Sequence, residues 1–144
     1  MFIVRKKFKI EYAHQLDDAF SSDCSKNIHG HSGIIEIFLK SNDLNIDGMV
    51  IDFGKIKFLI GDYIKSFDHA LIISEKFISK YPSLKEHNEK LKIVKYNPTA
   101  EEMARDIYQY VKRVLDQENF YSGKMLYKVR FHETDTGYAE YFSE

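Results

Sequence analysis

An alternation of apolar and charged residues begins at the N-terminus and limits what this chain can fold into. Its apolar side, closed by a histidine, comprises Phe2, Val4, Phe8, Ile10, Tyr12 and His14. Its charged side comprises Arg5, Lys7, Lys9 and Glu11, and Lys6 is the one charged residue on the apolar side. A period of two predicts a half-buried β-strand from Phe2 to His14. The chain therefore has to form a sheet that buries one of its faces.

A second stretch, from His31 to Lys40, alternates in the same way. One of its faces carries Gly33, Ile35, Ile37 and Leu39. The other face is mixed and carries Ile34, Glu36, Phe38 and Lys40. We expect this stretch to be the second strand. The residues between the two strands, 15–30, are more than a hairpin needs, and a loop of that length is usually functional.

Two helices are predicted between these strands and the last part of the chain. Asp52 is placed as the N-cap of the first helix, in which apolar residues recur at helical spacing and which we expect to end near Asp68–His69. Thr99 and Glu102 have the spacing of a capping box at the start of the second helix. Residues 70–97 lie between the two helices and show no clear pattern.

Alternation returns near the C-terminus and completes the predicted architecture. Residues 124–133 predict a third strand, and a short fourth strand is expected from Tyr138 to Phe142. The order strand–strand–helix–helix–strand–strand predicts a single α+β domain over residues 1–144. We expect a four-stranded antiparallel sheet with two helices on one face.

Composition excludes several classes of protein. The 22 acidic and 21 basic residues give a net charge of −1, so the chain has no general basic field for nucleic acid. No apolar run approaches the roughly 20 residues of a membrane helix. The N-terminal residues lack the order of a signal peptide, and a single cysteine excludes an intramolecular disulfide. We expect a cytoplasmic protein that binds neither nucleic acid nor membrane.

Three histidines occupy positions at which two paired strands would place their imidazoles close together on one face of the sheet. His29 and His31 are two residues apart, so they point to the same side of an extended strand. His14 ends the first strand on its apolar face, and pairing of the two strands would bring all three imidazoles together. Three imidazoles without an obvious fourth ligand are typical of a catalytic zinc site with an open position. The alternative is that each histidine is a hydrogen-bonded structural residue.

Cys24 precedes this pair in the pattern C-x4-H-G-H. It has three possible roles: a fourth zinc ligand, a buried small hydrophobe, or a thiolate that acts as base or nucleophile. The surrounding residues 21–27 are polar, which argues against burial and leaves the other two roles open.

Acidic residues at two other places have candidate roles. Asp68 and His69 end the first helix, where a carboxylate can orient an imidazole, although a simple helix-end cap explains them equally well. Glu133 is expected on the apolar face of the third strand, beside Tyr127, Val129 and Phe131. An acid there needs a partner, and a guanidine-like edge of a ligand would provide one. His87 and His132 are expected to be solvated and without a role.

Six short motifs follow one another over nearly the whole chain. They are Tyr12-Ala13-His14, Cys24-x4-His29-Gly30-His31, Gly48-Met49-Val50-Ile51-Asp52-Phe53, Phe67-Asp68-His69, Asn97-Pro98-Thr99 and Glu133-Thr134-Asp135. As a set they resemble the 6-pyruvoyl-tetrahydropterin synthase family, which includes the bacterial 6-carboxy-tetrahydropterin synthases of queuosine synthesis. One departure concerns Cys24: four residues separate it from His29, whereas the queuosine branch usually has three and the animal biopterin branch five.

The resemblance implies a fold, an assembly and a reaction. The family has the T-fold, in which three subunits form a β-barrel, two such trimers stack into a homohexamer, and the active sites lie between subunits. The implied enzyme is a lyase that eliminates triphosphate from 7,8-dihydroneopterin triphosphate. The 6-carboxy product, formed with loss of acetaldehyde, is favoured over the 6-pyruvoyl product. A non-catalytic pterin-binding homologue is the remaining alternative.

The resemblance also assigns roles to individual residues. His14, His29 and His31 match the zinc ligands of the family, and Cys24 matches its catalytic cysteine. Asp68 and His69 match the acid–base pair, and Glu133 matches the residue that anchors the pterin.

Overall fold

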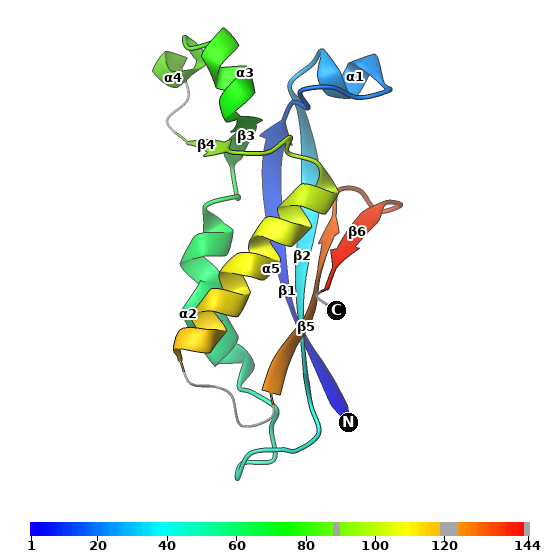
Figure 1. The fold of residues 1–144 in the computed structure, drawn as a ribbon, viewed down its shortest axis with the longest axis vertical. Coiled ribbons are helices and arrows are strands. Elements are labelled where there is room, and N and C mark those ends of the chain that lie inside the picture. The colour runs from blue at the N-terminus through cyan, green and yellow to red at the C-terminus, as the bar shows by residue number, and fades with distance from the viewer. Residues whose placement is uncertain (88–89, 119–123, 143–144) are drawn as a thin grey trace.

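A six-stranded sheet is the main element of the fold (Figure 1). The computed structural model describes residues 1–87, 90–118 and 124–142, apart from the side chains of 124 and 125. The strands are β1 (Phe2–His14), β2 (His29–Ser41), β3 (Ala70–Ser74), β4 (Leu91–Val94), β5 (Lys124–His132) and β6 (Tyr138–Tyr141). Their order across the sheet is β4-β3-β1-β2-β5-β6.

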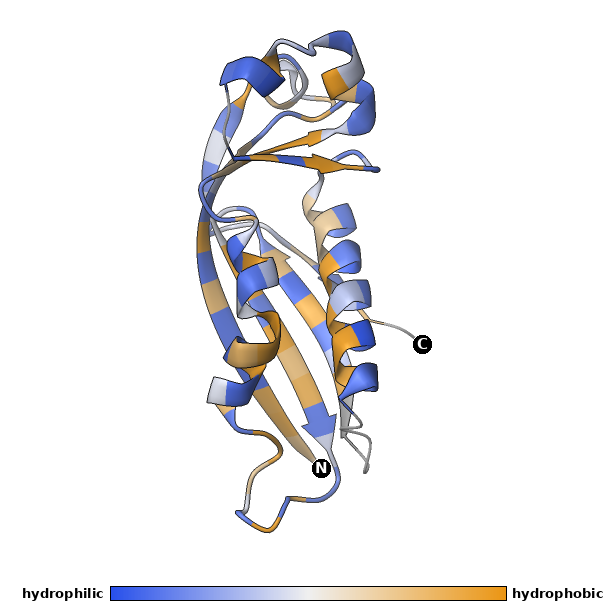
Figure 2. Ribbon diagram, turned by 90° about the vertical axis from the view of Figure 1, so that its left-hand side faces the viewer, coloured by the Kyte–Doolittle hydropathy of each residue, from blue (hydrophilic) through white to orange (hydrophobic). Residues whose placement is uncertain are grey.

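The antiparallel part of the sheet consists of β1, β2, β5 and β6. β1 and β2 pair without interruption from Phe2 opposite Ser41 to His14 opposite His29. β5 continues the sheet beside β2, and β6 pairs with the last residues of β5. Alternating apolar and polar bands run along these strands (Figure 2). The four strands predicted from alternation are therefore all present.

The number of strands was nevertheless predicted too low, because β3 and β4 extend the sheet. Both are parallel strands, β3 beside the end of β1 and β4 beside β3. All five residues of β3 are buried, so its sequence does not alternate between apolar and polar residues, and no period of two could be recognised. The sheet is therefore mixed, with an antiparallel centre and a short parallel flank.

Two long helices, α2 (Phe53–Lys65) and α5 (Ala100–Gln117), cover one face of the sheet. Asp52 caps α2 as predicted, by accepting a hydrogen bond from the amide of Gly54, but the helix ends at Lys65, before the predicted Asp68–His69. Thr99 caps α5 and accepts the amide hydrogen of Glu102 at 3.3 Å. The three short helices are α1 (Ser22–Ser25), α3 (Glu75–Lys80) and α4 (Leu84–His87).

The core lies between these two helices and the apolar face of the sheet. The helices contribute buried residues at helical spacing, including Ile56, Ile60, Ile64, Met103, Ile107 and Val111. The strands contribute Ile10, Ile35, Ile37, Val129 and Phe131. Each of these sheet residues comes from the apolar side of the alternation. None of the helices in the described ranges combines the length and hydropathy that crossing a bilayer requires.

Because of a β-bulge, Leu126 and Tyr127 of β5 face the opposite sides of the sheet from those predicted. The register between β2 and β5 shifts between Phe38 and Leu39, where Tyr127 becomes an extra residue without a partner on β2. Leu126, 4% exposed, enters the core instead, while Tyr127 lies near the ammonium groups of Lys40 and Lys128. The prediction that Tyr127 shares the buried face with Val129 was therefore wrong.

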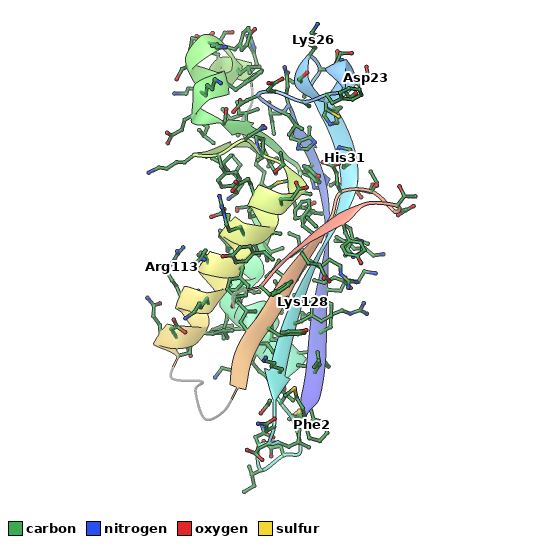
Figure 3. All side chains as sticks on the ribbon, turned by 45° about the vertical axis from the view of Figure 1, so that its right-hand side comes forward. Phe2, Asp23, Lys26, His31, Arg113 and Lys128 are labelled. Carbon is green, nitrogen blue, oxygen red and sulfur yellow. The ribbon has the colours of Figure 1, made fainter. Side chains whose placement is uncertain are left out.

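The face of the sheet without helices contains a buried acid. Glu36, 2% exposed, receives hydrogen bonds from Arg5 at 2.5 Å, from Arg130 at 3.3 Å and from His132 at 2.8 Å. We call these four residues the Glu36 cluster. His132 is thus bound to a carboxylate, and the prediction that it is merely solvated was wrong. The cluster residues come from β1, β2 and β5, and Lys128, which is labelled in Figure 3, lies on β5.

Candidate metal centre

The pairing of β1 with β2 brings the three predicted histidines together. His14 and His29 are direct partners in the register, and His31 lies two residues further along the same face of β2. One ring nitrogen from each lies within 4.8 Å of the other two. The convergence predicted from the strand pattern is therefore present.

Hydrogen bonds on the outer side of two rings determine where their protons lie. His14 Nδ1 is 2.9 Å from the carbonyl oxygen of Pro98, and His29 Nδ1 is 3.0 Å from that of Asn27. A carbonyl oxygen only accepts hydrogen bonds, so both Nδ1 atoms carry the hydrogen. In the neutral rings, both Nε2 atoms then present bare lone pairs.

These lone pairs face a common centre. His14 Nε2 and His29 Nε2 are 3.0 Å apart, and two acceptors at that distance repel each other unless a cation or a proton lies between them. His31 Nε2 is also buried, and no residue in the described part of the chain hydrogen-bonds to it. In metal-binding histidines, the ring nitrogen that does not bind the metal typically donates a hydrogen bond to a carbonyl group or a carboxylate, and Nδ1 of His14 and of His29 does so here. The donor set therefore fits a metal ion, and three imidazoles suit zinc.

The protonation of the triad also favours metal binding. Burial lowers the pKa of His14 to about 4, an effect that the Pro98 hydrogen bond opposes and the neighbouring imidazoles reinforce. Burial likewise lowers the pKa of His31, against the opposing charge of Glu133. Metal ligands must be unprotonated, and these environments keep both rings neutral at physiological pH.

Glu133 lies beside the triad rather than within it. β5 ends at His132, so Glu133 occupies the start of the turn to β6, where its amide donates to the carbonyl group of Gly137. Its Oε1 is 3.4 Å from His14 Nε2 and 3.9 Å from His31 Nε2. The carboxylate also lines a cavity of about 270 Å³ together with Thr99.

Asp68 and His69 form a pair immediately before β3. His69 Nδ1 is 3.1 Å from Asp68 Oδ2, while Asp68 Oδ1 accepts the amide hydrogen of Glu11 at 2.8 Å. That backbone hydrogen bond, followed by the contact with His69, lowers the pKa of Asp68, so the carboxylate stays ionised and orients the imidazole. His69 also has a φ of +56°, a conformation that is uncommon for a non-glycine residue and is often found at functional sites.

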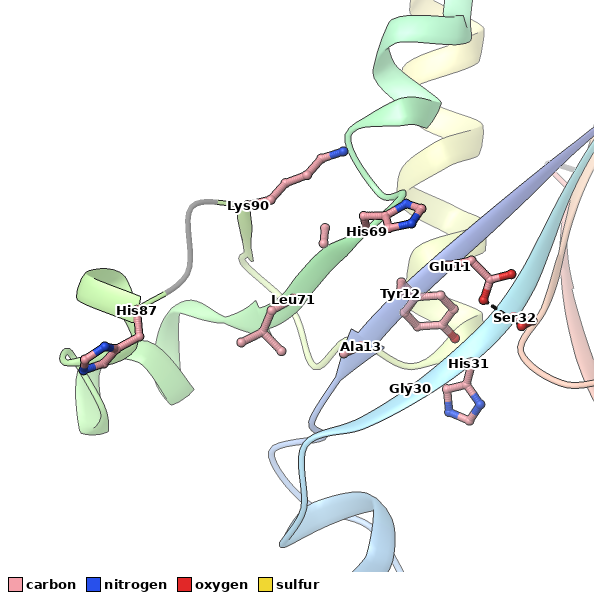
Figure 4. Close-up of a pocket in the computed structure, with 11 residues that line it drawn as sticks. Glu11, Tyr12, Ala13, Gly30, His31, Ser32, His69, Leu71, His87 and Lys90 are labelled. Atoms are coloured by element: carbon pink, nitrogen blue, oxygen red, sulfur yellow. Dashed lines mark hydrogen bonds between the residues drawn. The ribbon is translucent and has the colours of Figure 1, made fainter.

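One cavity is shared by His69 and by His31 of the histidine triad. It has a volume of about 600 Å³, and His31 and His69 both line it, together with Tyr12, Glu11 and Lys90 (Figure 4). Tyr12 belongs to the motif Tyr12-Ala13-His14, but sequence reasoning gave it no role, and it missed Glu11 and Lys90 altogether. Glu11 follows the strand alternation like its neighbours, and Lys90 lies in the stretch without a clear pattern, so nothing in the sequence marked these two residues.

Cys24 is separate from these groups. It is half-buried and unpaired in α1, within the loop that joins β1 to β2, and its carbonyl group accepts the amide hydrogen of Leu16. The cluster of ligating atoms within 4.8 Å contains the three histidines without Cys24. The geometry therefore does not support the role of fourth ligand.

The chain is similar in sequence to the proteins of one family. Residues 3–144 match the sequence model of the family described as 6-pyruvoyl tetrahydropterin synthase. A 6-carboxy-5,6,7,8-tetrahydropterin synthase of Helicobacter pylori is 32% identical over 97% of this chain and 72% of its own length. A protein of the same name from Aquifex aeolicus is 36% identical over 82% of this chain and 75% of its own length.

Solved structures show the same fold. An uncharacterized protein of Wolinella succinogenes superimposes with a TM-score of 0.82 at 20% identity, covering 99% of this chain and 98% of that one. The 6-pyruvoyl tetrahydropterin synthase of Caenorhabditis elegans superimposes with a TM-score of 0.70 at 21% identity, covering 99% and 96%. The fold is therefore the T-fold, an α+β architecture, as predicted. By its sequence and its fold, this chain belongs to the 6-pyruvoyl tetrahydropterin synthase family.

Proposed function

We propose that this chain is a zinc-dependent 6-carboxy-5,6,7,8-tetrahydropterin synthase of queuosine biosynthesis. The reaction converts 7,8-dihydroneopterin triphosphate and one molecule of water to 6-carboxy-tetrahydropterin, triphosphate and acetaldehyde. The observation that carries the proposal is the histidine triad, whose lone pairs face one centre beside the cavity that His69 also lines. The names of the Helicobacter and Aquifex relatives support the 6-carboxy product over the 6-pyruvoyl product.

The metal ion would be held by His14, His29 and His31. A zinc ion bound there supplies a Lewis acid that polarises oxygen atoms of the substrate side chain. The carbonyl groups of Pro98 and Asn27 hold two of the rings in the tautomer that leaves Nε2 free. The protein thus presents a site that needs little rearrangement to take up the ion.

The proton transfers are assigned to Cys24, Asp68 and His69. In this proposal the thiolate of Cys24 removes a carbon-bound proton beside the developing carbonyl group of the substrate. His69 relays protons on the other face through its Nε2, because Asp68 holds its Nδ1. The ionised state of Asp68 keeps the imidazole ready to accept a proton.

Glu133 is assigned to recognition of the pterin ring. Its carboxylate would accept two hydrogen bonds from the 2-amino and N3 edge of the pterin. Its position next to the triad would place the pterin side chain near the metal, and the cavity that it lines with Thr99 adjoins this point.

A second copy of the chain is expected to complete the site. Cys24 is outside the residues that line the cavity of His69, so one chain does not bring the thiol and this imidazole to the same cavity. We therefore include in the proposal a cytoplasmic homo-oligomer, a trimer or a hexamer, with its sites between subunits. The ligand is a small pterin triphosphate, and no nucleic acid or membrane takes part.

Incubation of the zinc-loaded protein with 7,8-dihydroneopterin triphosphate tests the proposal. Mass spectrometry should detect 6-carboxy-tetrahydropterin, and a coupled dehydrogenase assay should detect acetaldehyde. A product with the mass of 6-pyruvoyl-tetrahydropterin would contradict the assignment of the branch. Tight binding without any turnover would instead identify a non-catalytic pterin-binding homologue.

A further inference from the structure

The ring of Tyr12 lies against the histidine triad on the buried face of β1. Its centroid is 5.2 Å from that of His14 and 5.5 Å from that of His31, and Phe131 packs edge-on at 5.7 Å. Tyr12 is directly opposite His31 in the β1–β2 register and only 4% exposed. Its neighbours therefore hold the ring in one position beside two of the three imidazoles.

Gly33 makes room for this ring. A Cβ atom built on Gly33 would lie 2.8 Å from Cε1 of Tyr12 and 3.2 Å from Cγ1 of Ile10. Side chains elsewhere on this face of β2 are large, as in Ile35 and Ile37. The space that a side chain would occupy at position 33 is thus taken by the tyrosine ring.

The hydroxyl group of Tyr12 is not explained by packing. It is buried, and no residue in the described ranges hydrogen-bonds to it. In Figure 4 it points toward β2, near the place where His31 is attached to that strand. Buried polar groups normally have a partner, and a phenylalanine would fill the same space without leaving a donor unsatisfied. The hydroxyl group of Tyr12 and Nε2 of His31 are thus two buried polar groups on neighbouring rings without a hydrogen-bond partner among the described residues, and both are free to bind an atom of a ligand.

We propose that Tyr12 is a substrate-binding residue whose phenolic O–H donates a hydrogen bond to a side-chain oxygen of the pterin held at the triad. The inference rests on the proposed function, which places a hydroxylated pterin side chain there. A phenol suits this role because it is a neutral donor, and a hydrogen bond made away from water is strengthened. Tyr12 accordingly recognises the oxygen atoms of the pterin side chain and does not contribute to recognition of the pterin ring.

The affinities for two ligands distinguish this role from a general effect of the substitution on the site. We would titrate the zinc-loaded protein calorimetrically with 7,8-dihydroneopterin, which carries side-chain hydroxyls, and with 6-methyl-7,8-dihydropterin, which has none. Tyr12→Phe should weaken binding of the first by about 5- to 10-fold, the value of one neutral hydrogen bond, and leave binding of the second unchanged. Zinc content should stay equal to that of the parent protein.

Tyr63→Phe is the matched control. Its hydroxyl donates to Asp106 at 3.1 Å between α2 and α5, so its loss affects packing of the helices and should alter neither affinity. Equal weakening of both ligands by Tyr12→Phe would show a structural role and overturn the inference, as would no weakening at all. If the parent protein binds neither zinc nor dihydroneopterin, the proposed function falls and this inference with it. If the parent binds both, a failure concerns Tyr12 alone.

Discussion

Glu133 lies so close to the histidine triad that its proposed role in pterin recognition has to be measured separately from any effect on metal binding. Glu133→Gln keeps the size of the side chain but removes the charge and turns one acceptor into a donor. The lost bidentate contact should cost about 2–3 kcal/mol, or roughly 30- to 150-fold in affinity. Calorimetric titration with a dihydropterin gives the affinity, and elemental analysis should show unchanged zinc.

The control for this change is Glu75→Gln, at an exposed carboxylate in α3. It removes the same charge at a distance from the triad and should bind the dihydropterin as the parent protein does. If Glu133→Gln also binds as tightly as the parent, the pterin is anchored by another group.

Cys24 is expected to act on the substrate without holding the metal. Cys24→Ala should therefore abolish turnover and leave pterin affinity nearly intact, because the thiol is needed only for the proton transfer. Elemental analysis should still find about one zinc per chain, since three histidines suffice for an open site. Loss of zinc from this variant would make Cys24 a ligand and refute the mechanism.

Single residues differed in how far the sequence could predict them. The meeting of His14, His29 and His31 followed from the parity of two strands, which is a local property. The Glu36 cluster could not be predicted, because its four members come from three strands whose pairing no local pattern reveals. Tyr12 was placed correctly on the buried face, yet its unpartnered hydroxyl depends on neighbours distant in sequence.

Among the elements, the long ones and the short strand β6 were predictable, whereas β3, β4 and the three short helices were not. β1 begins and ends at the predicted residues, and both helix N-caps are where Asp52 and Thr99 indicated. β3 escaped prediction because it is buried on all sides, and the bulge at Tyr127 because one extra residue inverts a period-two pattern. Sequence periodicity thus reveals an element only where one of its sides is exposed to solvent and the other is buried.

Because of Glu36, the stability of the fold is expected to depend on pH. Burial alone would raise the pKa of this carboxyl, but the hydrogen bond from His132 and the charge of Arg5 outweigh it and lower the pKa below its usual value. A folded-state pKa below that of the unfolded chain adds stability above about pH 4.5, and this contribution is lost as the pH falls through the folded-state pKa. Glu36→Gln should therefore flatten the acid side of the stability curve.

Urea unfolding at a series of pH values between neutral and acid checks this expectation. Glu86→Gln, at an exposed carboxylate in α4, is the control and should keep the slope of the parent protein. A slope in Glu36→Gln as steep as that of the parent would mean that the other carboxylates account for the acid sensitivity.

At the scale of the whole molecule, the sheet has open edges. Among the described strands, β1 pairs with β3 only over Tyr12–His14, so its outer edge from Phe2 to Ile10 has no partner strand. β6 forms the opposite end of the sheet, and Phe2 and Ile3 on the open edge are about half exposed. Open edges of this kind are normally covered, and closure into a barrel removes them.

Sedimentation velocity should therefore detect an oligomer at micromolar concentration, in keeping with a trimer or a hexamer. Activity per chain should fall on dilution in step with dissociation, because one chain does not bring Cys24 to the cavity of His69. A stable monomer with full activity would refute both the assembly and the shared site.

The uninterrupted register between β1 and β2 has a consequence for how the length of this chain can vary. Deleting or inserting one residue in either strand between the core and the histidines would turn His14, or His29 and His31, to the opposite face. The three histidines thus keep their place relative to the core only if the number of residues between them and the core residues on the same face changes by an even number. Changes of length can accumulate without this penalty only in the loops, such as residues 15–28 beyond the two histidine-bearing ends.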